Sequence, residues 1–232
     1  MNSTLRVSRE ETSLRERATQ TLRTAILEGV FAPGQKLSER VLCESLGVSR
    51  SCVRETLQHL QAEGLITVVP HRGPEVTSIS AAEVRHIYEV RASLEALAVK
   101  GFVDNATPAQ LAALRTKVSE LAQASEAGQD NRLLVIKNQF YDILLEGCGN
   151  PVAGQLLRQL NNRVTVLRRV SMAQPGRLPR TIEELDTLVA AMERGDGDAA
   201  AALCVAHIRN AAANVLRSMA PERQHDAVDA PA

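Results

Sequence analysis

The sequence has few aromatic residues: Phe, Trp and Tyr together make up 2% of its 232 residues, and tryptophan is absent. Alternating runs of valine, isoleucine and threonine are also scarce, whereas alanine and leucine are abundant. Since alanine and leucine favour helices and β-branched or aromatic residues favour strands, this composition predicts a mainly helical protein. The length suits one or two domains, each with its own core.

Cysteine is also sparse, and no two cysteines form a C-x-x-C pair. The four are Cys43, Cys52, Cys148 and Cys204. This spacing argues against a disulfide scaffold and against a zinc or redox pair, and it is typical of a protein of the reducing cytoplasm. The sequence has neither the apolar core of a signal peptide near its start nor an apolar run of 18 residues. We therefore predict a cytoplasmic protein that does not span a membrane.

The chain has no excess of charge of either sign, because 27 lysines and arginines balance 27 acidic residues. A general basic field for nucleic acid is therefore absent, and nucleic-acid binding requires a local cluster of basic residues. Such a cluster lies around residue 50.

The first third of the chain carries the pattern of a helix-turn-helix. Apolar residues at helical spacing predict three helices, over residues 13–29, 38–46 and 49–64. Gly47 forms the tight turn between the second and the third. Two short helices joined by a glycine-containing turn are typical of this motif. Residues 1–12 are polar and aperiodic, which predicts a mobile arm.

A β-hairpin is predicted after the third helix. Leu65–Val69 is rich in β-branched residues, Pro70–Pro74 has the composition of a turn, and Val76–Ile79 is a second short strand. A hairpin in this place forms a wing. Residues 13–78 are therefore predicted to form a winged helix-turn-helix DNA-binding domain with three helices.

The remainder, residues 79–219, is predicted to be an antiparallel six-helix bundle. Ser80 and Glu83 have the spacing of a capping box. Breaks at glycine and proline separate the helices, which are expected at residues 80–104, 107–126, 130–146, 151–172, 180–194 and 198–217. A polar tail at residues 220–232 is predicted to be disordered.

The basic cluster lies at the start of the third predicted helix. Arg50 and Arg54 are four residues apart and share one exposed face. Their guanidinium groups can reach guanine O6 and N7 or phosphate oxygens, with the hydroxyls of Ser49 and Ser51 beside them. The alternative is that both arginines are ordinary solvated residues. Further candidate contacts to the same duplex are Arg40, His71, Arg72 and Gly73.

The segment from Pro33 to Val76 resembles the winged helix-turn-helix of GntR-family bacterial transcription regulators. It contains, in order and at the family spacing, PG-x-x-L-S-E-R, LGVSR-x-x-VRE-x-L, EGL and RG. The family's usual Thr-Pro after the Ser-Arg pair is Ser51-Cys52 here, which leaves the base preference at that position open. The resemblance implies that operator DNA is contacted by Arg40, Arg50 and Arg54, with Ser49 and Ser51 beside them and Gly73 at the wing tip.

The helical half resembles the effector domain of the FadR subfamily, of the FCD type and its VanR-like group. The shared features are Tyr88-Glu-Val-Arg91-x-x-x-Glu95, Gly149-Asn-Pro151, Gly195-Asp-Gly-Asp-Ala-Ala200 and Ala206-His207. The resemblance implies a homodimeric regulator, more often a repressor, that binds a near-palindromic operator. It also implies that a small, carboxylate-bearing metabolite in the helical domain modulates DNA binding.

Many members of that subfamily bind a divalent metal through one aspartate and three histidines. Only His207 of this ligand set is retained: Lys137 and Tyr141 occupy two of the other positions, and the third holds a leucine. One histidine does not make a metal site, so we predict no metal and no cofactor. A register shifted by one residue would offer Asn138 or Asp186 as oxygen ligands instead.

In place of the metal, the Lys137 ammonium can supply positive charge to an anionic effector, with Tyr141 and His207 as hydrogen-bond donors. The alternatives are a Lys137 that points to solvent and a His207 that is a hydrogen-bonded core residue. Arg91 either forms a structural ion pair with Glu95 or clamps the effector. The predicted effector site consists of Arg91, Lys137, Tyr141, His207 and Asn214.

Two other functions compete with a ligand-modulated regulator. In the first, the helical domain serves dimerisation only, and no ligand releases the protein from DNA. In the second, the helical domain is an enzyme with Cys148 as nucleophile and His207 as base. This pair lacks a third group to orient the base, so we predict that the protein is not an enzyme.

Overall fold

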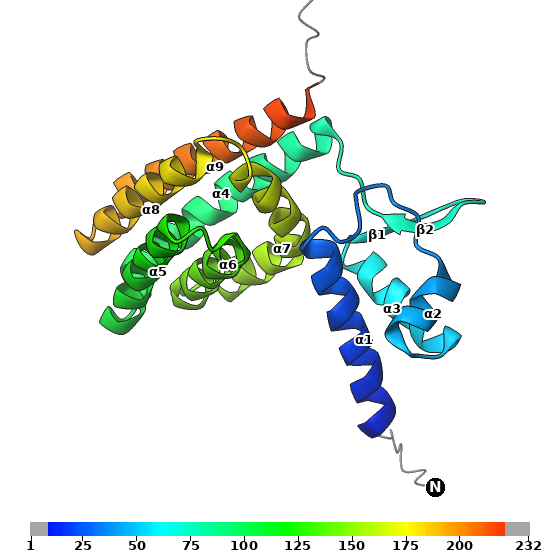
Figure 1. Cartoon of the computed structure of the whole chain (residues 1–232). Helices are drawn as coiled ribbons and strands as arrows, with labels where there is room; N and C mark the ends of the chain where they lie inside the picture. The colour runs from blue at the N-terminus through cyan, green and yellow to red at the C-terminus, as the bar shows by residue number, and fades with distance from the viewer. Residues whose placement is uncertain (1–8, 221–232) are drawn as a thin grey trace, which may run out of the picture. The chain divides into compact units, whose positions relative to one another are not determined.

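The computed structural model describes residues 9–220, which form two compact units. The first unit contains the chain up to Ser80 together with residues 158–166, and the second contains the rest. The first unit contains three helices, a two-stranded hairpin and a segment of a fourth helix, and the second contains helices alone (Figure 1). The predicted fold class, a mainly helical protein with a winged helix-turn-helix followed by a six-helix region, is confirmed.

The first unit follows the predicted order of elements. Helices α1 (Arg9–Leu27), α2 (Glu39–Leu46) and α3 (Arg50–Ala62) precede strands β1 (Ile66–Val69) and β2 (Gly73–Val76). Gly47 ends α2 in the left-handed conformation (φ 65°), which glycine adopts without a steric penalty. The buried core draws on all five elements and includes Leu22, Leu42, Val53, Leu60, Ile66 and Val76.

Helix α1 begins earlier than the sequence pattern indicated. It starts at Arg9, so residues 9–12, which the sequence pattern assigned to an aperiodic arm, are helical. The sequence there is Arg-Glu-Glu-Thr, and arginine and glutamate are good helix formers. Acidic residues at a helix N-terminus also interact favourably with the helix dipole. The rest of the predicted arm lies outside the described residues, as does the predicted tail beyond Ala220.

The second strand of the wing was placed three residues too late. β2 spans Gly73–Val76 instead of residues 76–79, and it pairs with β1 in antiparallel register from Val69 opposite Gly73. Positive φ angles at His71 (62°) and Gly73 (86°) close the turn. The other edge of β2 is also paired, because the Leu37 amide donates to the Pro74 carbonyl. Pairing on both edges determines where the strand lies, and this pairing is not visible in its composition.

Residues 81–219 form six helices, and their boundaries lie within three residues of the predicted ones. They are α4 (Ala81–Asn105), α5 (Pro108–Glu126), α6 (Asp130–Gly147), α7 (Pro151–Met172), α8 (Arg177–Glu193) and α9 (Gly197–Met219). Helix α9 packs along α4 and α8, and α5 packs on α6 and α8 (Figure 1). The predicted cap at Thr107 is a complete capping box with Gln110.

Helix α9 is the one helix of residues 9–220 that is long and apolar enough to cross a membrane, with a mean hydropathy of 1.3. One apolar face of this helix, however, packs into the protein interior, because Ala200, Cys204, Ile208 and Val215 are all buried. The same helix carries His207, which is hydrogen-bonded to a carboxylate. These contacts are those of a core helix in a bundle.

Candidate functional site

The predicted recognition residues surround the N-terminus of α3. Ser49 caps this helix, because its hydroxyl accepts a hydrogen bond from the Cys52 amide (3.3 Å) and also lies 2.9 Å from the Ser51 hydroxyl. Val53 and Leu57 are buried on the inner side of the helix, which leaves Arg50 and the two serines exposed. The exposed side therefore offers hydroxyls, a guanidinium group and free helix N-terminal amides to a nucleic acid.

The other two predicted arginines are each paired with an acidic residue of α2. Arg40 donates to Glu44, four residues along the same helix, at 2.9 Å. Arg54 lies on α3 and donates through Nε to both carboxylate oxygens of Glu39, at 3.0 and 3.1 Å. Both arginine side chains remain at least 65% exposed. These pairs are solvated and weak, so the arginines are accessible to phosphates or bases.

The hairpin tip presents its predicted residues at a tight turn. His71 and Arg72 are exposed, and Gly73 is half-buried. His71 has a positive φ, which is rare for a residue with a side chain. The tip is therefore a defined turn that carries polar and basic side chains outward.

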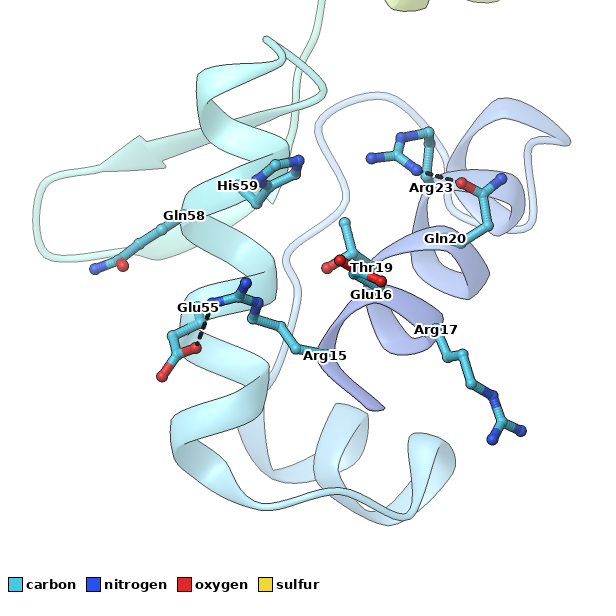
Figure 2. Close-up of a pocket in the computed structure, with 9 residues that line it drawn as sticks. All are labelled: Arg15, Glu16, Arg17, Thr19, Gln20, Arg23, Glu55, Gln58 and His59. Atoms are coloured by element: carbon cyan, nitrogen blue, oxygen red, sulfur yellow. Dashed lines mark hydrogen bonds and ion pairs between the residues drawn. The ribbon is translucent and has the colours of Figure 1, made fainter. Parts of the chain in front are cut away.

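Polar contacts between side chains hold α3 against α1 (Figure 2). Arg15 of α1 points toward Glu55 of α3, with an ion-pair distance of 3.4 Å. The Thr19 and Thr56 hydroxyls form a buried hydrogen bond. Arg15, Thr19 and Glu55 line a groove of about 880 Å³ whose walls carry three arginines and one histidine but only two glutamates. Basic side chains therefore outnumber acidic ones in the groove, and the contacts across it hold the recognition helix on its support.

The interior of the second unit contains charged residues that are almost completely buried, together with one glutamate, Glu184, that is 15% exposed. Helix α4 contributes two, α6 one, α7 one, α8 two and α9 one. We define the buried charge cluster as Arg91, Glu95, Lys137, Arg168, Arg177, Glu184 and His207. Four cationic side chains thus face two carboxylates and one imidazole. Buried charges are normally matched one to one, so the cluster has an excess of positive charge.

A chain of hydrogen bonds connects three residues of the cluster. Glu184 lies 2.5 Å from Nδ1 of His207, and Lys137 Nζ lies 3.4 Å from Nε2 of the same ring. Because a carboxylate only accepts hydrogen bonds, it places the imidazole proton on Nδ1, and Nε2 is left as an acceptor for Lys137. Lys137 is 3% exposed, so the alternative in which it points to solvent is wrong.

The protonation of these residues follows from their burial. Burial lowers the pKa of His207 to about 3, with a further lowering by the charge of Lys137, so the imidazole is neutral at pH 7. Burial also lowers the pKa of Lys137 well below its usual value, and the charges of Arg168 and Arg177 lower it further. Burial alone would raise the pKa of Glu184, but hydrogen bonds from His207, Arg177 and Asn210 outweigh it and lower this pKa to about 2.

Arg91 forms the predicted ion pair with Glu95, with Nε 2.8 Å from Oε1. The guanidinium also lies over the Tyr88 ring, 4.9 Å from its centroid. Its Nη1 atom, the second oxygen of Glu95 and the hydroxyl of Tyr88 are buried and have no hydrogen-bond partner among residues 9–220. Arg91 and Glu95 thus form the predicted ion pair, and three buried polar atoms beside it still have no hydrogen-bond partner among the described residues.

Tyr141 and Arg168 extend the cluster on the side of α6 and α7. Arg168 lies 3.9 Å from the centroid of the Tyr141 ring and donates to Asn138 at 2.7 Å. Tyr141 is 5% exposed, and burial raises the pKa of its hydroxyl. The structure thus places Arg91, Lys137, Tyr141 and His207 of the predicted effector residues in one buried region.

Asn214 does not join them. Its amide donates to the Asn210 carbonyl of its own helix, and its side-chain oxygen accepts from Arg217. Asn214 lies seven residues after His207 on α9, which corresponds to about 10 Å along the helix axis. At this distance Asn214 cannot share the immediate partners of His207. Asn210, three residues after His207, takes that place and donates to Glu184 at 2.8 Å.

Sequence reasoning missed Arg168, Arg177 and Glu184. Arg177 donates to Glu184 with both terminal nitrogens, at 2.9 and 2.8 Å. A signal for Glu184 was present, because it lies three residues after the buried Thr181 and directly before the buried Leu185. A carboxylate on the inner side of a bundle helix requires a partner, and that requirement would have directed attention to the buried positive charges.

The residues do not fit a metal site of the family type. Lys137 Nζ lies next to Nε2 of His207, the nitrogen that would face a metal once Glu184 holds the other one. Within the described part of the chain, no three His, Cys, Asp or Glu residues are grouped to hold a metal. Of the alternative oxygen ligands, Asp186 pairs with Arg115, and Asn138 accepts from Arg168.

Cys148 and His207, the nucleophile and the base of the alternative enzyme hypothesis, are not hydrogen-bonded to each other. Cys148 is buried against Ala98 and Leu157 and donates to the Leu145 carbonyl at 3.2 Å. The ring nitrogens of His207 face Glu184, Arg177 and Lys137 instead.

A winged helix-turn-helix with exposed arginines on α3, linked to a helical unit with buried cations, defines the class of DNA-binding regulators with a ligand-binding domain. Comparison with known families agrees: residues 14–76 match the bacterial regulatory proteins of the gntR family, and residues 86–210 match the FCD domain. The chain belongs to this family of transcription regulators, as the sequence resemblance implied.

Several transcription regulators are similar to this chain. The chain is 28% identical to the uncharacterized HTH-type transcriptional regulator YdhC of Bacillus subtilis over 82% of this chain and 85% of the relative. It is also 28% identical to the galactonate operon transcriptional repressor of Escherichia coli, over 80% and 89% of the two chains. The solved structure of E. coli McbR/YncC shares the fold, with a TM-score of 0.77 and 24% identity over 93% of this chain and all of the other.

Proposed function

We propose that this protein is a homodimeric, cytoplasmic repressor that binds a near-palindromic operator through α3 and releases it when a small carboxylate binds in the buried charge cluster. It has no enzymatic activity and requires no metal in this proposal. The observation that carries it is the excess of buried positive charge in the second unit, beside buried polar atoms that have no partner among the described residues.

The first part of the proposal concerns DNA. Arg50 and Arg54 are exposed on the first turns of α3, and the serine hydroxyls lie beside them. A recognition helix reads base edges in the major groove through residues near its N-terminus. Arg40 and the wing tip His71, Arg72 and Gly73 contribute contacts that position the protein on the DNA backbone.

The second part concerns the effector. A carboxylate beside Lys137 would supply the negative charge that the cluster lacks, and it would raise the lowered pKa of the ammonium group. The unpartnered Nη1 of Arg91 is available as a further donor, and Tyr141, whose hydroxyl stays protonated because burial raises its pKa, contributes another in the same buried region. In this arrangement the ammonium group does the work that a divalent cation does in metal-binding relatives. Its contacts with an anion are strong because the surroundings are dry.

Selection of duplexes from a random pool by the full-length protein tests the DNA part. We expect an enriched sequence made of two half-sites related by two-fold symmetry, since the two recognition helices of a dimer are related in the same way. Failure to enrich any sequence, or enrichment of a single unrepeated site, would contradict the proposal.

Release of the selected duplex tests the effector part. Fluorescence anisotropy is measured in the presence of a chelator with a panel of short mono- and dicarboxylic acids and, as controls, the matching amides. We expect one acid to weaken DNA binding while its amide does not. If no acid has an effect, the helical domain serves dimerisation only. Elemental analysis of protein purified without chelator should find no stoichiometric zinc, nickel or manganese, and a metal bound through His207 would refute the role of Lys137.

A further inference from the structure

We propose that Glu39 is a positioning residue for DNA recognition, which holds the Arg54 guanidinium so that its terminal edge faces a guanine. This inference rests on the proposed function, because it assumes that α3 reads DNA through Arg54. It adds a specificity-determining role for an acidic residue that has no place among the predicted DNA contacts.

The geometry of the pair is unusual for a surface ion pair. Arg54 donates through Nε alone, and that single N–H is shared between the two oxygens of Glu39 at 3.0 and 3.1 Å. The two residues come from different helices, fifteen positions apart in the chain. Since Glu39 is at the start of α2 and Arg54 is on α3, the pair connects the two helices of the motif at their solvent side.

The choice of Nε matters for chemistry. A guanidinium group has two edges that can form paired hydrogen bonds, one with Nε and one terminal nitrogen and one with both terminal nitrogens. Glu39 occupies Nε, and no contact of Nη1 or Nη2 is found among the described residues. The terminal edge therefore stays open. It matches the O6 and N7 acceptors of guanine, which are the commonest target of arginine in the major groove.

Glu39 also has an effect of the opposite sign. A carboxylate near the DNA surface repels phosphates, so it weakens binding to every sequence. Positioning, in contrast, reduces the number of conformations that Arg54 must lose on binding its correct base. A substitution that removes the charge is therefore expected to increase affinity for unrelated DNA and to reduce discrimination at one base pair. A merely structural role would not produce this combination.

Helix α2 offers a matched control. Glu44 pairs with Arg40 on the same helix through an exposed ion pair at 2.9 Å. Glu44→Gln removes the same charge as Glu39→Gln, while the Nε contact of Arg54 stays in place. Both side chains are partly or largely exposed, with 62% exposure for Glu44 and 34% for Glu39, so neither substitution removes a group from the core.

The experiment measures the affinity of full-length wild type and variants for the duplex that the wild type selects, with each base pair changed in turn, and for a scrambled duplex. Arg54→Lys should reduce discrimination at one position in each half-site. Glu39→Gln should reduce it at the same position by about fivefold or more, since a bidentate contact discriminates by at least this factor, and should bind the scrambled duplex more tightly. Glu44→Gln should also bind the scrambled duplex more tightly but retain the wild-type base preference.

Two results would overturn the inference while leaving the proposed function intact. In one, Glu39→Gln keeps wild-type discrimination at the position that Arg54→Lys affects. In the other, it loses discrimination evenly at all positions, which indicates a general disturbance of the motif. If Arg54→Lys itself leaves the profile unchanged, the assignment of Arg54 to base reading fails, and the inference fails with it.

Discussion

The recognition surface and the bundle interior use the same residue types in opposite environments. On α2 and α3, each paired arginine has one acidic partner and is at least 65% exposed. In the buried charge cluster, three arginines and one lysine are almost fully buried, and their number exceeds that of the two carboxylates. Solvated pairs contribute little to stability and exchange their partners readily, whereas buried charges require specific partners.

This contrast explains how the two regions can serve different tasks. Exposed arginines exchange an acidic side chain for a phosphate or a base at little cost. Buried cations with unpartnered neighbours form a site that an anion completes. A substitution in one region should therefore leave the task of the other unaffected.

The largest effect is expected on the recognition surface. Arg50→Ala together with Arg54→Ala should weaken binding to the selected duplex by about 2 to 6 kcal/mol, because each bidentate contact contributes about 1 to 3 kcal/mol of discrimination. Anisotropy titrations measure this loss. Arg85→Ala, which removes an exposed arginine of α4, serves as the control. A folded double variant with normal affinity would show that α3 does not read the operator.

The next effect concerns pH and the bundle interior. The pKa of His207 is about 3 in the folded protein and about 6.5 in the unfolded chain. Below pH 6.5 the unfolded chain therefore binds a proton that the folded protein does not. The contribution of His207 to the free energy of unfolding is thus fully present above pH 6.5 and is lost as the pH falls. The loss from this residue should be about 2 kcal/mol between pH 6.5 and 4.5.

Denaturant unfolding of wild type and His207→Gln across this range measures that loss. Glutamine can still donate to Glu184 and accept from Lys137, so the variant should fold and show a smaller pH dependence. His86→Gln, at an exposed position of α4, should retain the wild-type pH dependence. An identical pH dependence in wild type and His207→Gln would refute the neutral, buried imidazole.

A smaller effect is expected for Lys137→Met. Methionine fills a similar volume without a charge, and replacing a poorly compensated buried charge with an apolar side chain is often neutral or stabilising. We expect the free energy of unfolding of the ligand-free protein to rise by about 1 kcal/mol, with unchanged affinity for DNA. A loss of several kcal/mol would indicate that Lys137 is a structural residue.

The smallest effect is expected for Arg40→Ala. Arg40 is exposed and paired only with Glu44, and its predicted contact is to the DNA backbone. Its removal should weaken binding to the selected and the scrambled duplex by similar factors and reduce the dependence on salt concentration, as the loss of one phosphate contact does. A loss confined to the selected duplex would place Arg40 among the base-reading residues.

The sequence predicted most of the helices, because their limits depend on local chemistry. Ser49 and Thr107 are caps, and Gly47 and Gly176 have left-handed conformations at helix boundaries. The second wing strand was misplaced because its position depends on pairing with β1 and with residues 34–37. Such pairing is non-local and leaves no pattern within the strand.

The two candidate sites likewise differ in how much of each could be predicted from the sequence. The recognition residues are close together in the sequence, so a motif could identify them. The buried charge cluster combines side chains from five helices, and Arg177 and Glu184 became recognisable only through their contact with each other and with His207. Lys137 was singled out because it replaces a residue of a family motif, yet its burial is a consequence of tertiary packing.

The most direct test of the central claim is release of the selected duplex by carboxylates, measured for wild type and Lys137→Met in the presence of a chelator. Lys100→Met, at an exposed position of α4 paired with Asp198, is the control. We predict that a carboxylate releases wild type and the control but not Lys137→Met, although all three bind free DNA equally well. Equal release of all three proteins, or release that requires an added metal, would contradict a ligand site built on the buried ammonium.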